Sequence, residues 1–247
     1  MSRGYEKYHQ HYIRTSVQRS LISRHNFTYI NFFRFVLPII QRTDPAKILD
    51  IGAGAGTLSF YLASLGYRIV AVEVSQTATK IAEESLRWLK LENNLQFLQG
   101  KIEEFKYKGS FDLVLCLEVL EHCFDDRKVL RSIHNKLRKG GIMILSTPLR
   151  NAPLVKLGFV SKFDEEVGHL RRYDKNEIII KLEKAGFAVK SYIETEGIIR
   201  NSLFVFPMLG FIVKFLRSYL SDCFTVIDDL SGKLFGYSDA IIVARKK

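Results

Sequence analysis

ILDIGAGAGTLSFYLASLGYRIVAVEVS, residues 48–75, contains two short apolar runs separated by a glycine-rich turn and one amphipathic segment. Residues 47–51 predict a strand that ends at the glycines of positions 52–56. Leucines then recur at helical spacing up to Gly66, and residues 68–74 predict a second strand. A strand, a glycine turn, a helix and a strand in this order are typical of a parallel sheet with crossover helices.

The same alternation continues along the rest of the chain. Further strands are predicted at residues 95–98, 111–117, 142–146, 188–193 and 239–244. Ser75 is a candidate N-cap for a helix to about Lys90, and Asp125/Asp126 begin another that ends in Arg138-Lys139-Gly140-Gly141. Residues 149–173 are expected to be irregular. Asp174 and Glu177 form a capping-box pattern ahead of a helix over residues 178–185.

Length and composition exclude several classes of protein. The 247 residues are 47% hydrophobic and 26% charged, which excludes disordered and fibrous architectures and fits one large α/β domain. Cys116, Cys123 and Cys223 form no CxxC pair, so we expect no zinc site, no disulfide framework and a cytoplasmic location. No secretory signal is recognised at the N-terminus. The longest uncharged apolar run, residues 201–213, is too short to span a bilayer.

The net charge of +11 is concentrated at the two ends of the chain. Residues 1–48 carry a net +6, residues 49–197 only +2, and the last fifty residues +3. The basic N-terminal arm contains Arg3, Lys7, Arg14, Arg19 and Arg24, interleaved with tyrosines. Clustered cations permit nucleic-acid binding, but no RNA-binding module accompanies them.

The glycine turn and two acidic residues suggest a particular ligand. Asp50-Ile-Gly-Ala-Gly-Ala-Gly56 places its third glycine one residue earlier than the dinucleotide fingerprint does. Asp50 disfavours a diphosphate and favours a cationic amino group. Glu73 closes the second strand, where a carboxylate can accept hydrogen bonds from both ribose hydroxyls. Together these features describe S-adenosylmethionine better than NAD.

The sequence resembles the class I S-adenosylmethionine-dependent methyltransferases over about residues 45–195. Residues 48–75 look like their first two motifs, and FDLVLCLEVLEH, residues 111–122, looks like their fourth-strand motif, especially in the ubiquinone-biosynthesis O-methyltransferase group. LRKGGIMILSTP, residues 137–148, is similar to the segment that follows. The resemblance implies an α/β, Rossmann-like, seven-stranded, mostly parallel sheet with helices on both faces and the last strand antiparallel.

The resemblance also implies the cofactor site. Asp50, Gly52, Ala53, Gly54, Gly56, Glu73, Val74, Ile102, Glu103 and Leu117 form the predicted cofactor-binding set. The family usually places an acidic residue after the glycine near adenine, whereas this chain has Gly100-Lys101-Ile102-Glu103. Either the Ile102 amide and Glu103 contact the adenine, or this contact is weaker.

Candidate catalytic residues follow the fourth and fifth strands. Glu118 directly follows strand four, and the resemblance places it beside the methionine moiety or the acceptor. His122 is either a base or a residue that fixes the turn. His169 lies in a stretch that resembles the GH-x-R-R-Y segment bordering the acceptor site in some relatives, and a neutral imidazole can take a hydroxyl proton. Arg171 and Arg172 either bind an acidic acceptor group or form a solvated loop face. No metal site is predicted.

Two apolar flanks, residues 26–40 and 198–220, allow three interpretations. They pack on each other and on the sheet, they form a lid over a greasy acceptor pocket, or they form an interfacial helix. In the last case Lys214 and Arg217 lie beside Phe211 and Phe215, and the basic arm is drawn to an anionic membrane surface.

We therefore predict a single methyltransferase domain. Residues 1–44 would form a helical basic arm or lid, 45–196 the cofactor-binding core, 197–235 an apolar helical insertion and 236–247 the final strand. The expected reaction is methyl transfer to an oxygen, less favourably a nitrogen, of a small or lipid-linked acceptor. An RNA methyltransferase and a catalytically silent cofactor-binding module are the alternatives.

Overall fold

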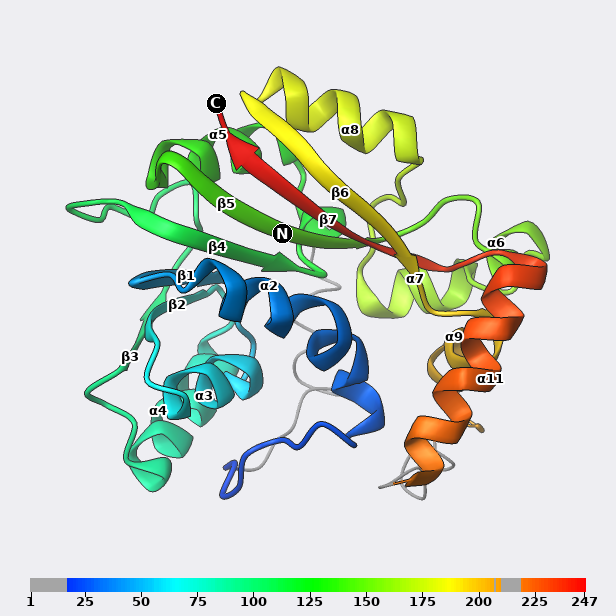
Figure 1. Cartoon of the computed structure of the whole chain (residues 1–247), viewed down its shortest axis with the longest axis horizontal. Coiled ribbons are helices and arrows are strands. Elements are labelled where there is room, and N and C mark those ends of the chain that lie inside the picture. Colours follow the sequence, from blue (N-terminus) through cyan, green and yellow to red (C-terminus); the bar gives the residue numbers. More distant parts are fainter. Residues whose placement is uncertain (1–16, 207, 210–218) are drawn as a thin grey trace.

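One mixed sheet organises the molecule (Figure 1). The computed structural model describes residues 17–206, 208–209 and 219–247. The strand order is β3-β2-β1-β4-β5-β7-β6, with β1 to β5 parallel and β7 antiparallel to both β5 and β6. The predicted fold class is confirmed. The predictions for Arg3, Lys7, Arg14, Lys214 and Arg217 fall outside the described residues.

The elements follow the predicted alternation of strands and helices. The strands are β1 Lys47–Ile51, β2 Arg68–Glu73, β3 Leu95–Gln99, β4 Phe111–Leu117, β5 Leu137–Pro148, β6 Phe187–Thr195 and β7 Asp239–Lys246. The helices of the core are α3 Thr57–Ser64, α4 Gln76–Leu89, η3 Leu120–His122, α5 Asp126–Lys136, α6 Pro153–Lys156, α7 Ser161–Val167 and α8 Lys175–Lys184. The flanks contribute η1 Phe27–Tyr29, η2 Phe32–Val36, α2 Leu37–Thr43, α9 Ile198–Val205 and α11 Tyr219–Phe235.

Helices cover both faces of the sheet, so successive strand residues enter different cores. Ile48 of β1 packs with residues of α2, α3 and α4, while Leu49 packs with residues of α5 and α8. Figure 1 shows α8 and α5 above the sheet and α2, α3 and α4 below it. Strands buried on both faces read as continuous apolar runs, which is why β1, β2 and β4 were predictable.

Two helix starts are confirmed in detail. The Ser75 hydroxyl accepts a hydrogen bond from the Ala78 amide (3.2 Å), and the Asp125 carboxylate accepts one from the Lys128 amide (2.9 Å). Short polar side chains at these positions satisfy amides that the first helical turn leaves unpaired.

Three local predictions are wrong. Helix α5 ends at Lys136, and the Arg138-Lys139-Gly140-Gly141 run lies in β5, because β5 already pairs with β4 at Leu137. Residues 149–173 are not all irregular, since they contain α6 and α7. The Asp174 side chain makes no cap bond and instead accepts a hydrogen bond from Arg150 (2.8 Å).

The two flanks pack on each other, as the first interpretation predicted. Phe27 of η1 contacts Phe204 of α9 and Phe224 of α11, with ring centroids 6.3 and 6.0 Å apart. The predicted helical arm is only partly helical, because residues 17–26 form no helix. Within the part of the chain that the structure describes, no helix has the length and apolarity needed to cross a membrane.

Candidate functional site

The glycine turn after β1 adopts a conformation that only glycine takes easily. Gly52, Gly54 and Gly56 have φ angles of +67°, +56° and +85°. The Gly52 amide donates to the Val72 carbonyl at the end of β2 (2.8 Å). A Cβ at Gly52 would lie 2.5 Å from Cγ2 of Val119, so both conformation and packing exclude larger residues here.

Asp50 lies beneath the glycine turn with only 5% of its surface exposed. Its Oδ2 atom accepts a hydrogen bond from the Ser59 hydroxyl (2.5 Å). Burial raises the pKa of Asp50 to about 7, although the Ser59 hydrogen bond lowers it and the nearby Glu73 raises it further. This carboxyl group therefore changes its charge near neutral pH, and a neighbouring cationic group would favour the ionised form.

Glu73 ties the glycine turn to the start of α4. The residue is fully buried, its Oε2 accepts a hydrogen bond from the Gly54 amide (2.8 Å), and its Oε1 accepts one from the Ser75 amide (2.8 Å). Burial raises the pKa of Glu73, against the effect of these amide hydrogen bonds. These two hydrogen bonds of Glu73 to the backbone were not predicted from the sequence. The ribose contact stays a prediction. Because each carboxylate oxygen of Glu73 already accepts one amide hydrogen bond, a ribose hydroxyl would have to use its second lone pair.

Two cavities meet at the glycine turn. The larger, about 650 Å³, is lined on one side by Gly52, Gly54 and Leu117. The narrower, about 30 Å³, is lined by Gly52, Val74, Gly100, Lys101, Ile102, Glu103, Val119 and other residues. Ile102 and Glu103 line this small cavity, and their contact with adenine stays a prediction.

The predicted catalytic residues all line the far side of the larger cavity. Glu118 has a positive φ of 55°, and its Oε1 accepts a hydrogen bond from the Ser146 hydroxyl (2.5 Å) at the end of β5. Asp239 and Glu196, which the sequence analysis did not select, line the same cavity. Burial and the neighbouring Glu118 carboxyl raise the pKa of Asp239 well above its usual range.

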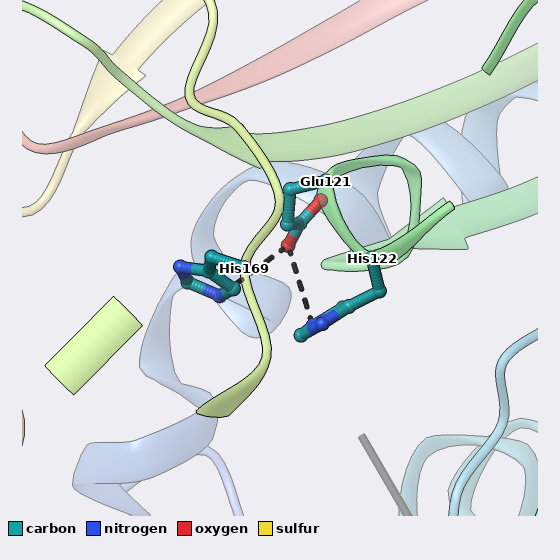
Figure 2. A group of neighbouring side chains, drawn as sticks. All are labelled: Glu121, His122 and His169. Carbon is teal, nitrogen blue, oxygen red and sulfur yellow. Dashed lines mark ion pairs between the residues drawn. The ribbon is translucent and has the colours of Figure 1, made fainter. Parts of the chain in front are cut away.

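Glu121 lies between the two histidines, as Figure 2 shows. Its Oε1 atom is 3.9 Å from Nε2 of His122 and 4.0 Å from Nε2 of His169, and its Oε2 accepts a hydrogen bond from Thr147 (3.3 Å). Glu121 has no exposed surface, and burial with the nearby Glu118 raises its pKa well above the usual range. Ligand atoms of Glu121, His122 and His169 lie within 4.8 Å of one another, so this group could hold a metal ion that the sequence did not predict.

Asp164 orients the His169 ring. Its Oδ1 lies 2.9 Å from Nδ1 of His169. The Arg172 guanidinium donates one hydrogen bond to Oδ2 of Asp164 (2.8 Å) and one to Oδ1 (2.6 Å). Burial opposes ionisation, but the hydrogen bonds from His169 and Arg172 keep the pKa of Asp164 below its usual value. With Nδ1–H donating to Asp164, the lone pair of His169 is on Nε2, the nitrogen nearer Glu121.

His122 supports the turn that precedes His169. Its Nδ1 lies 3.1 Å from the Gly168 carbonyl oxygen, and the ring centroids of His122 and His169 are 4.9 Å apart. His122 thus braces a different turn from the one after β4 that it was predicted to fix, and its alternative role as a base stays a prediction.

The interpretation as a solvated loop face is wrong for Arg172, which is buried and lines the larger cavity, whereas binding of an acidic acceptor group stays a prediction. Arg172 is 7% exposed and is bound to Asp164, while Arg171 pairs with Asp126 at 3.1 Å. Both guanidinium groups therefore neutralise carboxylates of this chain. Glu121 and Asp164 were not predicted as site residues, although both lie in sequence motifs already described. Glu121 directly precedes His122, and Asp164 lies five positions before His169, and this nearness to a histidine was the signal that could have identified them.

The fold and the site define a class of protein. A seven-stranded sheet with an antiparallel β7 carries a glycine turn at the carboxyl end of β1, beside the β1/β4 switch point where such sheets bind ligands. Acidic residues flank the turn in the sequence, Asp50 before it and Glu73 after it. This is the arrangement of S-adenosylmethionine-dependent methyltransferase domains. Residues 43–185 match the family model described as methyltransferase domain, and the chain belongs to this family.

Known proteins agree with this assignment. The chain is 36% identical over 124 residues to the mitochondrial ubiquinone biosynthesis O-methyltransferase of Schizosaccharomyces pombe, covering 49% of this chain and 45% of that protein. The chain thus spans about half the length of the curated relatives it matches.

Solved structures share the fold at low identity. The magnesium protoporphyrin IX methyltransferase of Synechocystis PCC 6803, solved with S-adenosylhomocysteine, gives a TM-score of 0.61 at 16% identity and covers 100% of this chain and 95% of its own. The N-methyltransferase NodS of Bradyrhizobium japonicum, also with S-adenosylhomocysteine, gives 0.56 at 16% identity, covering 89% and 87%.

Proposed function

We propose that the protein transfers the methyl group of S-adenosylmethionine to an oxygen atom of a small or lipid-like acceptor. The observation that carries this proposal is the larger cavity, which is lined at one side by the glycine turn and at the other by His169, already oriented by Asp164. A cofactor and an acceptor bound there would be adjacent.

The residues present divide the work between them. Asp50, Gly52, Gly54 and Glu73 would hold the methionine and ribose parts of the cofactor, and Ile102 with Glu103 would border adenine. When bound, S-adenosylmethionine supplies a methyl group activated by its sulfonium. Nε2 of His169 would take the proton of the acceptor hydroxyl as its oxygen receives the methyl group and the S–C bond breaks.

The walls of the cavity support a lipid-like acceptor. Tyr29, Phe32, Phe163 and Phe204 line it together with aliphatic side chains. Such walls bind apolar groups by removing them from water. The name of the Schizosaccharomyces pombe relative specifies O-methylation, which supports an oxygen acceptor.

A nitrogen acceptor is the second candidate, because four acidic side chains line the same cavity. These are Glu118, Glu166, Glu196 and Asp239, whereas Arg172, the arginine that lines this cavity, is paired with Asp164. Carboxyl groups favour a cationic amine over a neutral hydroxyl. Carboxyl groups also offer no cation to pair with an RNA phosphate backbone.

The test is transfer of a tritiated methyl group to separate panels of quinol lipids, glycans, amines and tRNA. We expect label in a hydroxylated, apolar acceptor, with a methoxy product by mass spectrometry. His169→Ala should lower kcat by about 100-fold because it removes the base, while S-adenosylhomocysteine binding by calorimetry stays unchanged. Ile180→Ala, on the exposed side of α8, is the matched control.

Each outcome separates the alternatives. An N-methyl product would replace the oxygen acceptor, and labelled tRNA would favour the RNA alternative. Normal cofactor binding without transfer to any panel would support the silent module. Full turnover by His169→Ala would remove the base from His169.

A further inference from the structure

Helix α11 turns its polar face toward the protein. Ser221, Thr225, Asp228 and Ser231 are buried. The Asp228 carboxylate accepts hydrogen bonds from the amides of Gly197 (2.8 Å) and Arg200 (2.7 Å), which begin α9. The inward face of α11 is therefore used to cap a neighbouring helix, which requires polar side chains.

The opposite face of α11 is apolar and exposed. Leu220, Ile227, Leu230 and Leu234 are 62%, 53%, 57% and 68% exposed, and Cys223 is exposed as well. These five residues, here called the outward stripe, alternate spacings of three and four, the pattern of a helix that packs along a second helix. A surface helix ordinarily has the reverse arrangement, with its apolar face against the core.

The area of this face matches that of a protein interface. Val226 and Phe235 flank the outward stripe and are 68% and 64% exposed. Together the large apolar side chains expose roughly 700 Å², close to the ~800 Å² that each partner contributes to a standard interface. Figure 1 shows α11 at the outer edge of the molecule, on the side away from β1 to β4, where a partner has access.

The charges of α11 do not suit an anionic membrane. Lys233 is its one basic residue, against three aspartates. Asp222 pairs with His25 (3.0 Å) and Asp229 pairs with Arg34 (2.5 Å) within the chain. Interfacial membrane helices depend on clustered Lys and Arg beside the apolar face. A helix with matching apolar spacing is the better partner.

We propose that two copies of this chain associate through the outward stripe of α11. A twofold interface uses the same surface on both copies, so an apolar stripe is complementary to itself. Ile227 and Leu230 lie at its centre and would contribute most, because central residues are the most completely removed from water.

The test is sedimentation equilibrium of the full chain over micromolar concentrations. We expect a species of twice the 28.5 kDa chain mass. Ile227→Glu and Leu230→Glu should each weaken association by more than about 100-fold, because symmetry places each charge in the interface twice. Ile180→Glu, at a 48% exposed position on α8, should leave association unchanged.

Folding is checked separately, since these positions are exposed in a single copy. The unfolding temperature of dilute, monomeric Ile227→Glu should equal that of dilute wild type. A wild type that stays monomeric, or an Ile227→Glu protein that still dimerises, overturns the proposal. A monomeric wild type that sediments with anionic phospholipid vesicles assigns the stripe to a membrane instead and also overturns it.

Discussion

Residues 50–75 supply most of the cofactor side of the larger cavity, with Leu117 of β4 beside them, whereas η3, the segment after α7, β6 and β7 assemble its acceptor side. On the cofactor side, short-range bonds such as Glu73 to Gly54 and to Ser75 fix the geometry. On the acceptor side, His169, which Asp164 orients, meets Glu121 across more than forty residues. A local motif can therefore identify a cofactor site, while an acceptor site depends on long-range packing.

The largest expected effect is on the cofactor side. Gly52→Ala would introduce a Cβ at φ +67°, 2.5 Å from Val119. Backbone strain and overpacking of about 3 kcal/mol should weaken S-adenosylhomocysteine binding by about 100-fold, measured by calorimetry. Gly66→Ala is the matched control, with φ +93° and nothing within 4 Å of the new Cβ. Gly66→Ala should lower the free energy of unfolding without changing S-adenosylhomocysteine affinity. If both variants lost the same affinity, backbone strain alone, and not the contact with Val119, would explain the loss in Gly52→Ala.

Asp164→Asn tests the acceptor side without altering the cofactor side. The amide cannot hold both His169 and Arg172 as the carboxylate does, so His169 loses its fixed orientation. We expect kcat to fall by about 10- to 100-fold and the pH profile of kcat to shift, with unchanged S-adenosylhomocysteine affinity. If only the affinity for S-adenosylhomocysteine changed, Asp164 would act on the cofactor side of the cavity, and the assignment to the acceptor side would be wrong.

A smaller, pH-dependent effect is expected from Asp50. Because its pKa is about 7 and the cofactor amino group favours the ionised form, S-adenosylhomocysteine affinity should rise about tenfold from pH 6 to pH 8. Calorimetry at several pH values measures this. In Asp50→Asn the slope should disappear, and a slope that persists would assign it to another group.

Stability of the free protein should change in the opposite direction. The folded state binds the Asp50 proton more tightly than the unfolded chain, whose pKa is 3.8. The contribution of Asp50 to stability is thus complete below that value and is lost as pH rises toward about 7. Urea unfolding at pH 5 and pH 8, with Asp50→Asn as reference, isolates this contribution.

The smallest effect concerns a purely local feature. Ser75→Ala removes the hydroxyl that accepts from Ala78 and should lower the free energy of unfolding by about 1 kcal/mol, measured with urea. The Ser75 amide that braces Glu73 remains, so cofactor affinity should stay nearly the same. A large affinity loss would mean that the cap also positions the glycine turn.

Local patterns predicted the fold better than the ends of its elements. The apolar run of β4 was placed correctly because both sheet faces bury it. The start of β5 was missed because cations followed by glycines resemble a helix end, and only the pairing of Leu137 with Phe111 shows that the strand has begun. The predicted cap at Asp174 was also wrong because of a long-range contact, since the Asp174 carboxylate accepts a hydrogen bond from Arg150 instead.

The sequence by itself determined the parallel sheet, the glycine turn and the two acidic residues beside it, because periodicity, glycine conformation and residue order are local properties. Only the tertiary structure decided that Glu121 lies between His122 and His169, that Arg172 serves Asp164, and that α11 exposes its apolar face. Those facts depend on which distant segments share a wall of the cavity or a side of a helix. Such contacts follow from packing of the whole chain, and no single stretch encodes them.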